Sequence, residues 1–94
     1  MVADKISMQK LMKYLNLTNK ALEIIKNKII KSRESEAKKI IEMAANYLSD
    51  AAHFEKKGDF VNAFAAVNYA HGWIDAGVRL GIFDVNDNKI FTVK

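Results

Sequence analysis

Long helices are the feature that this sequence predicts most strongly, because almost nothing in it interrupts them. The 94 residues contain no proline and only four glycines, and these two residue types most often end helices and form turns. Half of the residues are hydrophobic and 28% are charged, which is ordinary for a folded chain. The length suits one domain over residues 1–94. We expect an all-α fold, a three-helix up-and-down antiparallel bundle with a short C-terminal extended tail or hairpin.

The first predicted helix covers about residues 4–31, with Asp4 as its N-cap. Its apolar positions recur at the three-then-four spacing of a buried stripe. Thr18 fills one step among Met8, Leu11, Leu15, Leu22, Ile25 and Ile29. The polar break that follows contains no glycine or proline. We expect a turn there, with Ser32 or Ser35 capping the next helix; a single helix bent at this point is the alternative.

A tight reversal joins the second and third predicted helices, at about residues 35–57 and 59–80. Gly58 can adopt the left-handed conformation that ends a helix, and Asp59 can cap the next one. The two helices should therefore be antiparallel neighbours. The buried stripe of the second helix consists of Ile40, Ala44, Tyr47, Ala51 and Phe54, with Ile41 and Leu48 beside it.

The third predicted helix ends at Gly81, and Ile82 is placed for the apolar contact of a Schellman ending. Beyond it, the tail at residues 82–94 has two short apolar runs that flank a turn-forming Asn-Asp-Asn. Both a hairpin and an extended strap fit this pattern. Either would have to pack on the helices, because a lone hairpin is marginally stable in water.

The third predicted helix is apolar on nearly all sides. Its core face is expected to be Phe60, Ala63, Phe64, Val67, Ala70, Ile74 and Val78. A surface helix should be polar on the other side, but here that side carries Ala65, Ala66, Tyr69, Trp73, Ala76 and Leu80. Three explanations are open: the tail covers this side, a second copy covers it in a homodimer, or an unknown protein partner does. Gly72 and Gly77 each cost about 1 kcal/mol inside a helix, which close packing would offset.

The basic residues are concentrated in the first part of the chain. Residues 1–39 hold ten Lys/Arg and four Asp/Glu, a net charge of +6, whereas residues 40–94 hold five and seven, a net charge of −2. A basic half can bind nucleic acid or an anionic ligand. The basic surface would consist of Lys10, Lys13, Lys20, Lys26 and Lys28, with Arg79 from the third helix. The alternative is a solvated helix face, because thirteen of the fifteen basic residues are lysine and nucleic-acid readers usually use more arginine.

Polar side chains on the third helix are a second group of candidates. The structural interpretation is an Asp75–Arg79 ion pair at i, i+4 spacing, with His71 hydrogen-bonded to Asp75 or Asn68. The functional interpretation is a small polar pocket in which Arg79 binds an anion and His71 titrates nearby. An enzyme that uses His71, Asp75 and Arg79 would need such a pocket.

Familiar catalytic and metal-binding patterns are missing from the sequence. Without cysteine there is no disulfide, thiol catalysis or thiolate metal site. The Asp50-x-x-His53 spacing of a di-iron bundle has no second copy. We therefore expect no catalytic residue, no metal and no cofactor. No apolar run approaches the roughly 20 residues of a membrane span, and the first residues lack the apolar stretch of a signal peptide. We expect a cytoplasmic protein with no membrane partner.

One long stretch of the sequence resembles a known family over about residues 37–85. Its run GDFVNAFAAVNYAHGWIDAGVRLGIFDV, residues 58–85, is similar to the signature of the small archaeal domain-of-unknown-function 357 family. The resemblance implies a compact three-helix bundle in an archaeal cytoplasm and no activity, because the family has none assigned. It directs attention to the matching positions Tyr69, His71, Trp73, Asp75 and Arg79.

Together these observations predict a non-enzymatic helical module that docks a protein partner or a second copy of itself. The docking surface would be the aromatic and small-residue side of the third helix. The alternative is binding of nucleic acid or an anionic ligand through the basic first helix and Arg79.

Overall fold

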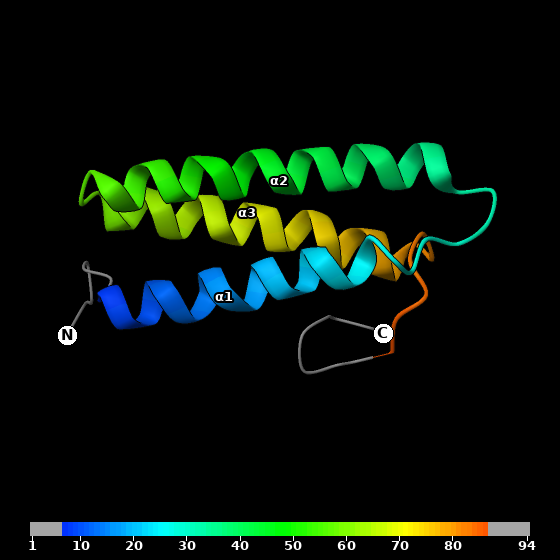
Figure 1. The fold of residues 1–94 in the computed structure, drawn as a ribbon, viewed down its shortest axis with the longest axis horizontal. Coiled ribbons are helices and arrows are strands. Elements are labelled where there is room, and N and C mark those ends of the chain that lie inside the picture. Colours follow the sequence, from blue (N-terminus) through cyan, green and yellow to red (C-terminus); the bar gives the residue numbers. More distant parts are fainter. Residues whose placement is uncertain (1–6, 87–94) are drawn as a thin grey trace.

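Three helices form the fold in the computed structural model, which describes residues 7–86. They are α1 (Met8–Ile25), α2 (Glu34–Lys56) and α3 (Phe60–Arg79). α2 runs antiparallel to both α1 and α3 (Figure 1). This arrangement confirms the predicted all-α three-helix up-and-down bundle.

α3 is the central helix of the bundle. It packs along α2 and against α1, whereas α1 and α2 meet at few points (Figure 1). The molecule is accordingly flat, with extents of 44 × 25 × 17 Å. A helix with a neighbour on each side buries a wider arc than a surface helix, which accounts for the buried part of the apolar surface of α3 but not for its exposed aromatic residues. Its buried residues are Ala63, Ala66, Val67, Ala70, Ile74, Gly77 and Val78.

The reversal between α2 and α3 has the predicted chemistry. Gly58 adopts a left-handed φ of 77°, and the backbone amide of Asp59 donates to the carbonyl oxygen of Phe54 at 2.9 Å. This is the Schellman hydrogen bond expected of a glycine-terminated helix. The Asp59 carboxylate accepts a hydrogen bond from the backbone amide of Asn62, as an N-cap does. The short connection therefore holds α2 and α3 in a fixed antiparallel register.

α1 is shorter than predicted, and its predicted end at residue 31 is wrong. It begins after Ser7, whose hydroxyl accepts a hydrogen bond from the backbone amide of Lys10 at 3.1 Å, and the predicted cap Asp4 lies outside the described residues. Met8 is exposed and does not belong to the buried stripe. The rest of the predicted stripe within the helix is buried, namely Leu11, Leu15, Thr18, Leu22 and Ile25.

The segment after α1 is extended because it pairs with the segment after α3. Ile29 and Phe83 form an antiparallel bridge, and the amides of Ile30 and Asp84 donate backbone hydrogen bonds across it at 2.9 and 2.7 Å. β-branched isoleucines favour extended backbone, and this tertiary pairing overrides their helical spacing. Residues 82–86, which we call the strap, therefore pack on the bundle, as either predicted form of the tail requires. The choice between a hairpin and an extended tail also involves residues 87–94, which lie outside the described part.

A turn precedes α2, as predicted, so the alternative of a single bent helix is wrong. The residues that form and cap this turn differ from the predicted ones. Ser32 adopts a left-handed φ of 76°, which is uncommon for a residue with a side chain. Arg33, not Ser32 or Ser35, is the N-cap residue, and its side chain makes no capping hydrogen bond. Instead the Arg33 guanidinium hydrogen-bonds the carboxylate of Glu36, and this hydrogen bond lowers the pKa of Glu36 below its ordinary value.

The two glycines inside α3 have opposite surroundings. A Cβ atom at Gly77 would lie only 2.5 Å from Cε2 of Phe83, whereas a Cβ atom at Gly72 would have no neighbour within 4 Å. The expected close packing is thus found at Gly77 and not at Gly72 among the described residues.

We expect opposite effects of alanine at these two positions. Gly77→Ala should lower the free energy of unfolding by about 1–3 kcal/mol, because the added methyl group displaces Phe83. Gly72→Ala should raise it by about 0.5–1 kcal/mol, because alanine favours the helix and meets nothing. Urea denaturation of both variants in dilute solution checks this, and equal effects of the two substitutions would contradict the packing of Phe83.

Candidate functional site

The five candidate residues of α3 do not form a single site. Tyr69 and Trp73 lie on the side of the helix next to α2. His71 and Asp75 face α1, and Arg79 is exposed in the last turn. The five residues therefore belong to separate surfaces of this helix.

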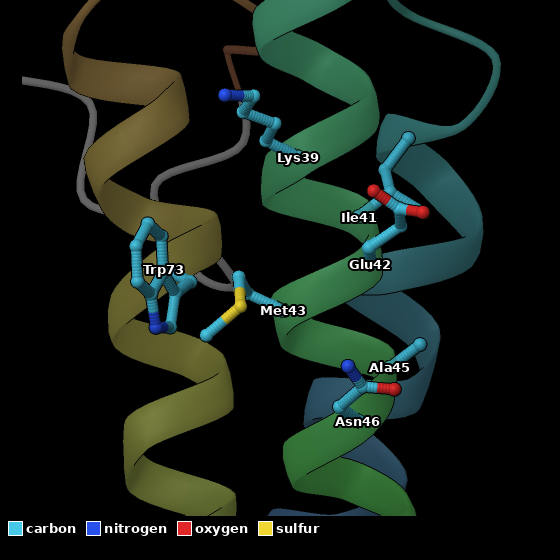
Figure 2. Close-up of a pocket in the computed structure, with 7 residues that line it drawn as sticks. All are labelled: Lys39, Ile41, Glu42, Met43, Ala45, Asn46 and Trp73. Carbon is cyan, nitrogen blue, oxygen red and sulfur yellow. The ribbon is translucent and has the colours of Figure 1, made fainter.

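An exposed aromatic surface spans α2 and α3, and we define it as Met43, Tyr47, Tyr69 and Trp73. The ring of Tyr69 stacks on that of Tyr47, with centroids 4.9 Å apart and planes inclined by 12°. The side chain of Met43 points toward the indole of Trp73 (Figure 2). Tyr69 is 64% exposed and Trp73 36% exposed, so this surface is open to solvent in the described part of the chain.

The register of the α2–α3 reversal brings these residues together. Tyr47 and Tyr69 lie eleven residues before and after Gly58, and Met43 and Trp73 lie fifteen residues before and after it. Positions equally distant from a tight reversal lie opposite one another in an antiparallel helical pair. Tyr47 belongs to the predicted buried stripe of the second helix, and Met43 is not among the predicted site residues. Their equal spacing from Gly58 is the signal that could have identified both.

Trp73 also borders an open hollow of about 670 Å³ along α2. Its other lining residues are Lys39, Ile41, Glu42, Met43, Ala45 and Asn46 (Figure 2). Only Lys39 and Met43 extend to the Trp73 side, whereas Ile41, Glu42 and Ala45 point away from it across α2 (Figure 2). The hollow is thus an open surface along α2 and does not enclose a ligand.

A small polar cavity of about 220 Å³ lies between α1 and α3. The hydroxyl of Thr18, which is only 1% exposed, lies 3.0 Å from Nδ1 of His71. Nε2 of His71 lies 3.7 Å from Oδ2 of Asp75. The rest of the lining comes from Tyr14, Leu17, Asn68 and Gly72. This geometry agrees with the structural interpretation of His71 at the edge of the core, but the sequence did not indicate Thr18 as its partner.

Two expectations for Arg79 are wrong. Within residues 7–86, the side chain within ion-pair distance of Asp75 is His71 and not Arg79. Arg79 also does not line the polar cavity, so in the described part of the chain it is not combined with His71 in the predicted anion pocket. The reason is geometric: Asp75 turns toward α1, whereas Arg79 lies on the solvent side of α3.

The polar cavity has the residue order of a catalytic triad, with a hydroxyl and a carboxylate on opposite sides of an imidazole. However, the hydroxyl of Thr18 is buried, so a substrate cannot reach it without opening the bundle. The cavity is also smaller than the roughly 300 Å³ of typical small-molecule sites. Within residues 7–86 no group of three or more His, Asp or Glu side chains is placed to hold a metal ion.

The predicted basic surface is spread along the molecule. Its five lysines are all exposed on α1 and the segment after it: Lys10, Lys13, Lys20, Lys26 and Lys28. Lys26 forms an ion pair with Glu23 at 2.9 Å. Nζ of Lys10 lies 5.8 Å from the ring centroid of Phe64, which precedes Arg79 by fifteen residues on α3. At 1.5 Å per residue, Phe64 and Arg79 are about 22 Å apart along α3. Lys10, which lies beside Phe64, therefore does not form one patch with Arg79.

The fold and these surfaces define a small all-α bundle with an open aromatic face. A family model described as "Protein of unknown function (DUF357)" matches residues 13–83. The chain belongs to this family, which confirms the resemblance noted from the sequence. No curated protein and no solved structure matched the chain. In the described part of the chain, no helix combines the length and the apolar character that crossing a membrane requires.

Proposed function

We propose that this protein is a non-enzymatic interaction module that docks a protein partner through its aromatic surface. The observation that carries the proposal is the exposure of Tyr69 and Trp73 beside Met43 and Tyr47. Exposed apolar groups that gather in one place mark interaction sites more often than isolated ones do. Burial of these rings against a partner would remove apolar area from water, which favours association.

The described part of the tail supports this proposal because it leaves the aromatic surface open. Phe83 packs against Gly77, and the backbone on either side of it pairs with the segment after α1. The strap thus packs at the C-terminal end of α3, beyond Trp73. Residues 82–86 therefore leave the aromatic surface available to a partner or a second copy.

The chemistry of the aromatic surface suits an anchoring role. Tyr and Trp are enriched among the residues that carry most of the binding energy at interfaces. The stacking of Tyr47 on Tyr69 already orders both rings, so less conformational entropy is lost when a partner binds. Apolar anchoring of this kind depends weakly on salt, in contrast to binding through lysines.

Capture of partners from a lysate of the source organism tests the proposal. The tagged chain should retain a protein after nuclease treatment and at raised salt, and Trp73→Asp should weaken this retention by about 30-fold or more, as expected for loss of an aromatic anchor. Met8→Asp is the matched control, because Met8 is similarly exposed but lies on α1. Circular dichroism verifies that both variants fold. Equal retention by the two variants would contradict the proposal.

Nucleic-acid or anionic-ligand binding through the α1 lysines and Arg79 is the alternative, and the same experiment decides it. Loss of the captured material on nuclease treatment, or affinity that falls steeply with salt, would favour this alternative. The separation of Lys10 from Arg79 and the pairing of Lys26 with Glu23 give it less support.

A further inference from the structure

We infer that two copies of this chain exchange their first helices, so that α1 of each copy packs on α3 of the other in a domain-swapped dimer. The inference goes beyond the proposed function and does not depend on the aromatic surface. It rests on three features of the fold: the contacts of α1, the backbone of the connection that follows it, and the flat arrangement of the helices.

The contacts of α1 are made almost entirely with α3, because α1 and α2 meet at few points. They include the hydrogen bond between Thr18 and His71 and the edge-to-face contact of the Tyr14 and Phe64 rings, whose centroids lie 5.3 Å apart. A second copy of the chain has the same α3 and accepts α1 with identical contacts. The interface of the swapped dimer is therefore the one already present within the chain.

The connection between α1 and α2, residues 26–33, contains a strained residue. Ser32 has a φ of 76°, a left-handed conformation that is costly for a residue with a side chain. The connection contains no glycine or proline, and its three lysines and one arginine are good helix formers. If the connection became helical, Ser32 would return to a right-handed φ, and α1 and α2 would form one continuous helix.

The strap opposes this change and keeps the chain closed. The bridge between Ile29 and Phe83, with the backbone hydrogen bonds beside it, holds residues 28–30 extended. These hydrogen bonds are lost when the connection becomes helical, but the new helical turns form hydrogen bonds of their own. Relief of the strain at Ser32 then favours the open chain. Because two chains must associate, the swapped form gains population as the protein concentration rises.

The flat bundle has the geometry that a swap requires. α1 and α2 lie at opposite edges with α3 between them, and the connection is at one end (Figure 1). A half-turn about an axis normal to the flat face, placed at that end, brings α2 of one copy into line with α1 of the other, with the same chain direction. A straight helix can therefore leave one bundle and enter the other. The twofold symmetry makes both exchanges equivalent, so the dimer is closed.

Substitutions at Ser32 test the inference, because its side chain is exposed. Ser32→Gly should favour the monomer, since glycine adopts a left-handed φ without strain and disfavours the helix. Ser32→Ala should favour the dimer for the opposite reasons. From helix propensity alone, the dimer dissociation constants of the two variants should differ by about 25-fold, about fivefold for each of the two connections. Sedimentation equilibrium measures this difference.

Ser49 provides the matched control. It is exposed within α2 and stays helical in both the monomer and the dimer, so Ser49→Gly and Ser49→Ala should have equal dimer dissociation constants. Equal dissociation constants for the two Ser32 variants, or an equally large difference at Ser49, would overturn the inference. It would also be overturned if the chain stayed monomeric at the high concentrations used for nuclear magnetic resonance, even with Ser32→Ala.

Isotope-filtered nuclear magnetic resonance identifies the swap in the unmodified chain. Labelled and unlabelled copies are mixed in denaturant and refolded together at high concentration, and the dimer is isolated. The contact between the Tyr14 and Phe64 rings then joins two chains and should give an intermolecular nuclear Overhauser effect. A dimer that associates through another surface keeps this contact within each chain. The absence of the intermolecular signal from the dimer would therefore overturn the inference.

Discussion

Replacing Phe83 with alanine should remove about 3–5 kcal/mol of the free energy of unfolding, the usual cost of deleting a buried phenylalanine. Phe83 is 3% exposed. Its ring packs against Gly77 and occupies the space that a side chain at position 77 would fill. The loss would be a large part of the total stability of a small domain, which is typically about 5–15 kcal/mol.

Urea denaturation followed by circular dichroism measures this effect. Asp84→Ala is the matched control, because Asp84 is exposed in the same strap and contributes to the bridge through its backbone amide, which the substitution keeps. We expect the control to change stability by less than about 0.5 kcal/mol. A loss below about 1 kcal/mol for Phe83→Ala would show that the strap does not belong to the core.

The second large effect is expected at Ile74, in the middle of the central helix. Ile74 is fully buried, and α3 packs against both of the other helices. Ile74→Ala should therefore leave a cavity that the bundle cannot close by moving one helix, at a cost of about 2–5 kcal/mol. Leu80→Ala at the C-cap of the same helix is the control and should cost less than about 0.5 kcal/mol in dilute solution, because Leu80 is exposed. Similar losses for the two variants would contradict the central position of α3.

The parts of the fold that could be predicted from the sequence are those that local chemistry determines. Gly58 and Asp59 specify a reversal with known hydrogen bonds, and Gly81 ends α3 in the same manner, with the amide of Ile82 donating to the carbonyl oxygen of Gly77 at 2.9 Å. The end of α1 could not be predicted, because Ile29 pairs with Phe83, a residue far along the chain. Local periodicity contains no information about such a partner.

The same distinction explains which candidate-site contacts could be found. The tight reversal fixes the register of α2 on α3, so the Tyr47–Tyr69 stack follows from counting residues. The hydrogen bond between Thr18 and His71 depends on the axial position of α1 relative to α3. The connection between α1 and α2, over residues 26–33, is too long to fix that position. The exposure of Tyr69 and Trp73 could be anticipated, because the sequence places them away from the core face of α3.

The bridge between Ile29 and Phe83 has a consequence for the order in which the molecule folds. Its two residues are 54 positions apart in the chain, so forming it early would require closing a long loop, which is entropically unfavourable and slow. The α2–α3 pair, in contrast, forms across a reversal of a few residues. The helical hairpin should therefore assemble first, and α1 should join it last, when the bridge closes. Until then one flank of α3 should remain uncovered, so we expect this late step to determine how long a newly made chain exposes its core.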